Sequence, residues 1–416
     1  MPPPTRDDLF ALAERALAYA SGEAQAMAWW ERQLSAGPGG AVTTEAVTVE
    51  VAVLRGGRVG IVSTTDVDDR GLQRAAAGAA RLAAQGAEVT RGLPEPAPGR
   101  VHEGYDARTL ALDPARYGEA LGPWDSWRAG AARTAIASVT GVRAFEERTF
   151  GDLRVRRHGA PGRSLELTAA AVSAAELDPT ALAGEAEALL GRSEPAAVEP
   201  GEYPVVLGPW AVAEVLRRAA LAFAGPRAPL ADALGTRVAA SCVNLSDSPR
   251  FAATLPRSYD AEGAPRQPLP LIQDGVAHRL VLPGSGHAQT PGGTGGTPPE
   301  HVVLVGGGAA DLAELAAPVE RGLFIPALSV HGAWIVGRRG AAMAEGVRHI
   351  RGGRRAEPAP NLTVLFEPLE LLGRVHALTA RQRTIPPPLQ RSARTASAIV
   401  CPALRAAGGL HVVGPA

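Results

Sequence analysis

Residues 204–225 read PVVLGPWAVAEVLRRAALAFAG, and this stretch predicts a strand, a tight turn and a helix in direct succession. The strand is the apolar run Val205–Leu207, and the Gly-Pro pair that follows supplies the turn. The helix carries two adjacent arginines, Arg217 and Arg218. Two such arginines usually form a solvated helix surface, and the functional alternative is contact with a partner or a carboxylate.

The regions on either side of this stretch predict two domains. A chain of 416 residues is too long for one ordinary core. The segment 193–204 is polar and contains Pro and Gly, which is typical of a linker. It separates a predicted N-terminal α/β domain, residues 1–192, from a strand-rich C-terminal domain, residues 205–416. The predicted fold class is therefore α+β.

Local patterns support this division. In the N-terminal half, alternating valines around Gly56-Gly57 predict a β-hairpin over 46–65. Further patterns predict helices over 7–20, 66–85, 117–121 and 178–190. Strands are predicted over 24–30, 145–150, 153–157 and 165–170. The C-terminal half predicts short helices over 309–316 and 369–374 among short strands over 269–274, 276–281, 302–305, 323–330, 333–336, 362–367 and 410–413.

The composition excludes several classes of protein. The formal net charge is zero, and all 42 basic residues are arginine, so there is no general electrostatic argument for a nucleic-acid partner. The longest apolar runs have only the length of a strand, so no membrane partner is expected. The N-terminus lacks the pattern of a secretory signal, and we expect a cytoplasmic protein.

The nine histidines do not form a helical metal motif, because no two of them stand four or five residues apart on a helix. A metal site built across strands from His278, His287 or His301 stays open as an alternative. Cys401, in SAIVCPALR, precedes a proline inside a predicted strand, and we expect it to pack in the core. The glycines at 306–308 follow a strand, but they lack the spacing of a dinucleotide-binding loop.

Several segments together resemble the TldD/PmbA family, and within it the PmbA (TldE) branch. In the first half the resemblance is carried by LRGGRVGIVSTTDVDDRGLQRAAAGAARLA (54–83), the GLPEP element and SLELTAAAV (164–172). In the second half it is carried by GEYPVVLGPWAVAEVL (201–216), YDAEGAPRQPLPLIQDGVAHRLV (259–281), HVVLVGGGAADLAEL (301–315) and PALRAAGGLHVVG (402–414). The order and spacing of these segments match the family over nearly the whole chain.

The resemblance implies a dimer that encloses a central cavity. Its catalytic members are zinc peptidases that trim unfolded or leader peptides, and they use a helical HExxxH motif and a cysteine ligand near the C-terminus. In this chain the first histidine of the motif corresponds to Arg217, the glutamate to Arg218 and the second histidine to Ala222. The segment 386–397, where the resemblance places the cysteine ligand, contains no cysteine. Cys401 adjoins the following strand and does not take over that role.

The leading hypothesis is a non-catalytic TldE-type subunit that pairs with an HExxxH-bearing, TldD-like paralogue. This chain would then hold no cofactor, and the partner would hold zinc. Arg217, Arg218 and His287 are candidate contacts for the partner or for an unfolded or precursor peptide. Two alternatives remain: a self-sufficient, homodimeric metallopeptidase with unconventional ligands such as His278, His287 or His301, and a stand-alone regulatory or binding protein.

Overall fold

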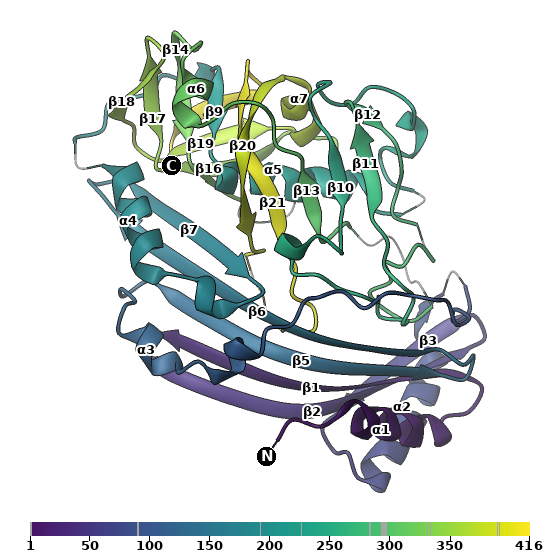
Figure 1. The fold of residues 1–416 in the computed structure, drawn as a ribbon. Coiled ribbons are helices and arrows are strands. Elements are labelled where there is room, and N and C mark those ends of the chain that lie inside the picture. The colour runs from purple at the N-terminus through teal and green to yellow at the C-terminus, as the bar shows by residue number, and fades with distance from the viewer. Residues whose placement is uncertain are drawn as a thin grey trace.

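The computed structural model describes residues 2–89, 91–191, 193–225, 227–282, 284–292, 298–330, 332, 334–388, 390 and 392–416. Three sheets dominate the described part of the chain, and helices pack on them (Figure 1). This arrangement confirms the predicted α+β fold class.

The first sheet is antiparallel and has seven strands in the order β4-β3-β2-β1-β5-β6-β7. The predicted hairpin is confirmed, since Gly56 and Gly57 both have positive φ in the two-residue turn between β2 and β3. The two strands predicted over 145–157 are one long strand, β6. The members are β1 (Glu23–Gly37), β2 (Gly40–Arg55), β3 (Arg58–Thr64), β4 (Ala87–Glu88), β5 (Ser126–Ser138), β6 (Arg143–His158) and β7 (Ser164–Ala171).

Helices cover one face of this sheet, and the other face looks toward the C-terminal sheets (Figure 1). Thr5 caps α1 through a reciprocal capping box with Asp8, and Asp68 caps α2. Both helices pack on alanines and valines of β1, β2 and β5. The helices of the N-terminal half are α1 (Arg6–Ala18), α2 (Asp69–Ala83), α3 (Pro114–Gly118) and α4 (Pro179–Leu190).

The C-terminal half contains a ten-stranded and a five-stranded sheet. The larger consists of β9 (Val205–Leu207), β10 (Leu245–Asp247), β11 (Leu269–Gln273), β12 (Val276–Ala277), β13 (Val302–Leu304), β14 (Arg321–Ile325), β17 (Arg348–Arg351), β18 (Arg354–Pro358), β20 (Val375–Ile385) and β21 (Ile399–Ala406). The smaller consists of β8 (Gly201–Glu202), β15 (Ala327–Ser329), β16 (Gly340–Glu345), β19 (Leu362–Phe366) and β22 (Leu410–Pro415).

Two strand predictions in this half are wrong. The run 323–330 is split at Pro326, which lacks a backbone N–H, so that β14 and β15 belong to different sheets. Of the strand predicted over 333–336, Ala333 lies outside the described residues, and residues 334–336 form no strand. The predicted short helices are confirmed as α6 (Leu312–Ala316) and α7 (Pro368–Gly373).

The strand–turn–helix at 204–225 lies at the centre of the C-terminal half. Strand β9 is fully buried, pairing parallel with β14 and antiparallel with β21. Helix α5 (Pro209–Ala220) begins with proline at its first turn, which suits that position because the missing N–H would be unpaired there. A Cβ at Gly208 would lie 2.8 Å from the carbonyl oxygen of Pro326, so the turn needs glycine.

The largest apolar cluster joins the two halves of the chain. It includes Leu34 and Trp127 from the first sheet together with Val206 and Leu404 from the ten-stranded sheet. The domain boundaries at 192 and 205 stay a prediction.

An ion pair with a buried carboxylate also joins the halves. Glu262, fully buried, accepts a hydrogen bond from the backbone N–H of Gly292 at 2.7 Å and pairs with Arg91. Burial and the charge of Asp260 raise the pKa of Glu262 from 4.5 to about 7, although Arg91 opposes this change.

We expect this carboxyl to make stability depend on pH. Because Glu262 keeps its proton in the folded state between pH 4.5 and about 7, and loses it in the unfolded state, the free energy of unfolding should fall as pH rises through this range. The expected loss is about 2 kcal/mol. Urea unfolding at pH 5 and pH 8 measures it. Glu262→Gln should remove this part of the pH dependence, and an unchanged slope in that variant would contradict the assignment.

Candidate functional site

Arg217 and Arg218 both contact a carboxylate of their own helix. The Glu214 side chain, which is 5% exposed, pairs with Arg217 three residues later and with Arg218 four residues later, the latter at 2.6 Å. The two arginine side chains are only 23% and 18% exposed, so the interpretation as a solvated surface is wrong. Arg218 also lies over the ring of Trp334, 5.8 Å from its centroid.

Arg217 connects α5 to the segment in which the resemblance places the cysteine ligand. One of its terminal nitrogens donates to the carbonyl oxygen of Pro386 at 3.2 Å. Burial lowers the pKa of Arg217, while Glu214 opposes that change. Arg217, Glu214 and Pro386 line a cavity of about 220 Å³ that also touches β6, β7 and β15.

The residues at this place do not fit a zinc ion. A guanidinium carries no electron pair for a metal, and Ala222, which is 1% exposed in the turn after α5, has no ligand atom. Cys401 is buried in β21, where its thiol lies 3.2 Å from the carbonyl oxygen of Pro209, and burial raises its pKa well above the usual value. The burial of Cys401 confirms the prediction that this residue packs in the core.

A strap between β20 and β21, defined here as the described residues 386–388, 390 and 392–398, reaches from the ten-stranded sheet to the first sheet (Figure 1). Side chains of the first sheet hold its backbone. Arg154 donates to the carbonyl of Pro387 at 2.6 Å, and Arg128 donates to that of Gln390 at 2.8 Å. Further along, Glu31 accepts from the N–H of Ala393 at 2.6 Å.

Arg148 anchors both this strap and a neighbouring loop. Its side chain, which is 2% exposed, donates to five backbone carbonyls at 2.6–3.0 Å: those of Leu255, Pro256, Ala393, Arg394 and Ala396. Burial lowers the pKa of Arg148 to about 10, so the guanidinium keeps its charge at neutral pH. The anchor was not predicted, because nothing near Arg148 in the sequence indicates these distant partners.

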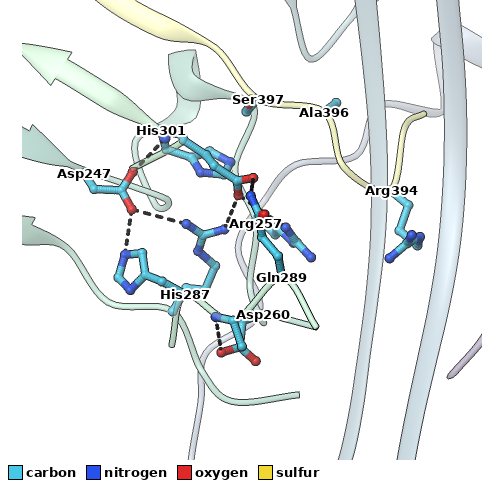
Figure 2. Close-up of polar contacts among 12 residues, drawn as sticks. Asp247, Arg257, Asp260, His287, Gln289, His301, Arg394, Ala396 and Ser397 are labelled. Carbon is cyan, nitrogen blue, oxygen red and sulfur yellow. Dashed lines mark hydrogen bonds and ion pairs between the residues drawn. The ribbon is translucent and has the colours of Figure 1, made fainter. Parts of the chain in front are cut away.

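A second polar cluster lies beside the strap (Figure 2). Asp247 at its centre pairs with His287 at 2.6 Å and with Arg266 at 3.2 Å, and it accepts from the backbone N–H of His301 at 2.6 Å. Arg266 also pairs with Glu300 at 3.1 Å. All five residues come from β10 or from the loops next to β11, β12 and β13.

The electrostatics of this cluster favour a fixed network. Burial alone would raise the pKa values of Asp247 and Glu300, but their bonded partners lower both values. The pKa of Glu300 falls to about 2. Burial lowers the pKa of His301 far below its usual value, so its ring is neutral. These groups hold the loops around β10 together, because each carboxylate is matched by a buried cation.

Two of the three histidines of the alternative metal site meet at Asp247, and the third lies apart from them. His287 and His301 are 4% and 0% exposed and both contact Asp247, whereas His278 is exposed at the end of β12. Among the described residues, no group of three His, Cys, Asp or Glu side chains is arranged to hold a metal. The roles of Arg217, Arg218 and His287 as peptide or partner contacts stay predictions.

The comparison with protein families decides the relationship. Residues 200–413, slightly more than half of the chain, match the model described as the PmbA/TldA metallopeptidase C-terminal domain. The chain belongs to the PmbA/TldD family. The matched region contains α5, the strap and the Asp247 cluster, so these features lie within the family's metallopeptidase domain.

Solved structures extend the likeness to nearly the whole chain. TldE from Thermococcus kodakarensis has a TM-score of 0.79 and 17% identity, with 97% of this chain and 99% of that chain covered. A candidate modulator of DNA gyrase from Thermotoga maritima has a TM-score of 0.76 and 19% identity, and the match covers 98% of this chain and 99% of that chain. A similarly described protein from Bacteroides thetaiotaomicron has a TM-score of 0.75 and 16% identity, and the match covers 98% of this chain and 98% of that chain. At these identities the likeness concerns the fold alone.

The search of curated sequences gave no significant match. Among the described residues, none of the helices combines the length and apolar character that a membrane crossing requires.

Proposed function

We propose that this PmbA/TldD-family chain is a non-catalytic, TldE-type subunit of a two-subunit zinc metallopeptidase that acts on unfolded or precursor peptides. In this proposal the zinc ion and the catalytic glutamate belong to an HExxxH-bearing paralogue, and this chain completes the wall of the substrate cavity. The structural likeness to a TldE protein supports the choice of branch.

One observation carries the proposal. The Arg217 guanidinium, at the position that the resemblance assigns to the first histidine ligand, bonds to Glu214 and to the Pro386 carbonyl. It thereby links the same two segments, α5 and the strap, that a zinc ion would link in a catalytic relative. A positive charge fixed there would repel a divalent cation. The polar requirements of the place are met within the chain.

The cavity beside Arg217 supports a role in holding peptide. Strand β15 lines it and stands at the end of the five-stranded sheet, where among the described strands it pairs only with β16. An unpaired strand edge offers backbone donors and acceptors to an extended peptide, which needs no particular sequence to pair with it. This suits a substrate without stable structure.

Co-expression with an HExxxH-bearing relative from the same genome tests the proposal. We expect the two chains to copurify and to cleave a flexible peptide together, while neither this chain alone nor a complex with glutamine in place of the partner's motif glutamate does so. The result would instead establish a self-sufficient enzyme if this chain alone had peptidase activity and stoichiometric zinc, and if substituting His287 or His301 removed both. Failure to bind any such relative would favour a stand-alone binding protein.

A further inference from the structure

The strap is held as an extended peptide ligand would be held. Arg128, Arg148 and Arg154 donate to its backbone carbonyls, and Glu31 accepts from a backbone N–H and from the hydroxyl of Ser392. Most of these contacts address the backbone, so they would accept many sequences. Within this frame the side chain of Arg394 is an exception, because it contacts side chains of the first sheet rather than its backbone.

The residues of the first sheet that contact or attract the Arg394 guanidinium, Met27, Trp29, Glu31 and Glu50, are called here the Trp29 site. The Arg394 guanidinium carbon lies 4.7 Å from the centroid of the Trp29 ring, within the range of a cation–π contact. One terminal nitrogen lies 3.5 Å from the sulfur of Met27. Glu50 stands opposite Met27 on β2 and, like Glu31, attracts the guanidinium electrostatically.

Arg394 is held more weakly than the other strap contacts. Its side-chain Nε has no hydrogen-bond partner among the described residues, and its guanidinium donates to the thioether of Met27, which is a weak acceptor. Arg257 nearby repels it. Arg148, by contrast, satisfies five carbonyls. The Arg394 side chain could therefore leave the Trp29 site while the strap backbone stays anchored.

Exposed residues lie next to this place. Thr395, next to Arg394 in the strap, is exposed, and Ala46, which pairs with Glu31 across β1 and β2, is exposed as well. Figure 2 shows Arg394 lying apart from the Asp247 cluster, so its displacement would leave that network intact.

We propose that the Trp29 site is a subsite for an arginine side chain of a bound peptide, and that Arg394 occupies it as a placeholder until such a peptide arrives. The inference rests on the peptide-binding role proposed above and adds a preference to it. A planar guanidinium stacks on an indole ring and is more weakly hydrated than an ammonium, so arginine should be preferred over lysine.

Calorimetric titration of the full-length chain with N-acetylarginine amide tests the subsite. Arg394→Ala should bind this probe about tenfold more tightly than the wild-type chain, because the Trp29 site is then vacant and a cation–π contact forms. The citrulline analogue, which has the same shape without the charge, should bind neither protein measurably. Trp29→Leu introduced into Arg394→Ala should abolish the gain.

Arg355→Ala provides a matched control, since Arg355 also lies over a ring, that of Phe324, at 5.3 Å and is exposed. The proposal is overturned if the probe binds this variant as well as it binds Arg394→Ala, if wild type and Arg394→Ala bind equally, or if citrulline binds like arginine. Should Arg394→Ala not fold, Arg394→Gln keeps the stem and takes its place. Because the titration uses this chain alone, its failure leaves the copurification test of the subunit role unaffected.

Discussion

Arg148→Ala should lower the free energy of unfolding by about 4 kcal/mol, since it leaves several buried carbonyl groups without a donor. The wild-type guanidinium is 2% exposed and reaches five of them. A methyl group cannot donate, and the space left behind is lined by polar oxygen atoms. Arg148→Lys keeps the charge but lacks the planar fork, so we expect an intermediate loss.

Urea unfolding measures this loss, and hydrogen exchange locates it. Arg163→Ala is the matched control, because Arg163 is 3% exposed and also donates to buried carbonyls, those of Leu190, Val347 and Ala359. Both variants should be destabilised, but only Arg148→Ala should speed exchange at the amides of Ala393 and Ala396. Equal protection of the strap in the two variants would refute the anchoring role of Arg148.

The scaffold could be predicted because its signals are local. The Gly56-Gly57 turn requires positive φ at both residues, which glycine permits, and the alternating valines beside it fix the register of β2 and β3. Thr5 and Asp68 mark helix starts through bonds made within three residues. The strand Val205–Leu207 and the helix after it follow from the same kind of pattern.

The site contacts were harder to predict because their partners are remote in the sequence. The carbonyls that Arg148 holds lie 107–248 residues away, and His287 meets Asp247 only after several loops have folded. A local signal did exist for Glu214, which stands three and four residues before the two arginines, the spacing of helical ion pairs. That spacing could have indicated that Arg217 and Arg218 are paired rather than solvated.

Glu214→Ala should lower the free energy of unfolding by about 3 kcal/mol. The carboxylate is the shared partner of Arg217 and Arg218, so its removal leaves two largely buried guanidinium groups close together without a counter-charge. Glu214→Gln keeps the shape and one hydrogen-bond acceptor, and its cost should be smaller. Thermal and urea unfolding of the purified full-length chain measure both variants.

A double-mutant cycle distinguishes this ion cluster from ordinary packing. If Glu214 serves mainly to balance Arg217, then Arg217→Met should offset part of the damage, and the double variant should be more stable than the sum of the single losses by about 1–2 kcal/mol. Strictly additive losses would show that the two side chains act independently. A coupled result would show that Glu214 holds the Arg217 guanidinium in the position from which it donates to the Pro386 carbonyl of the strap.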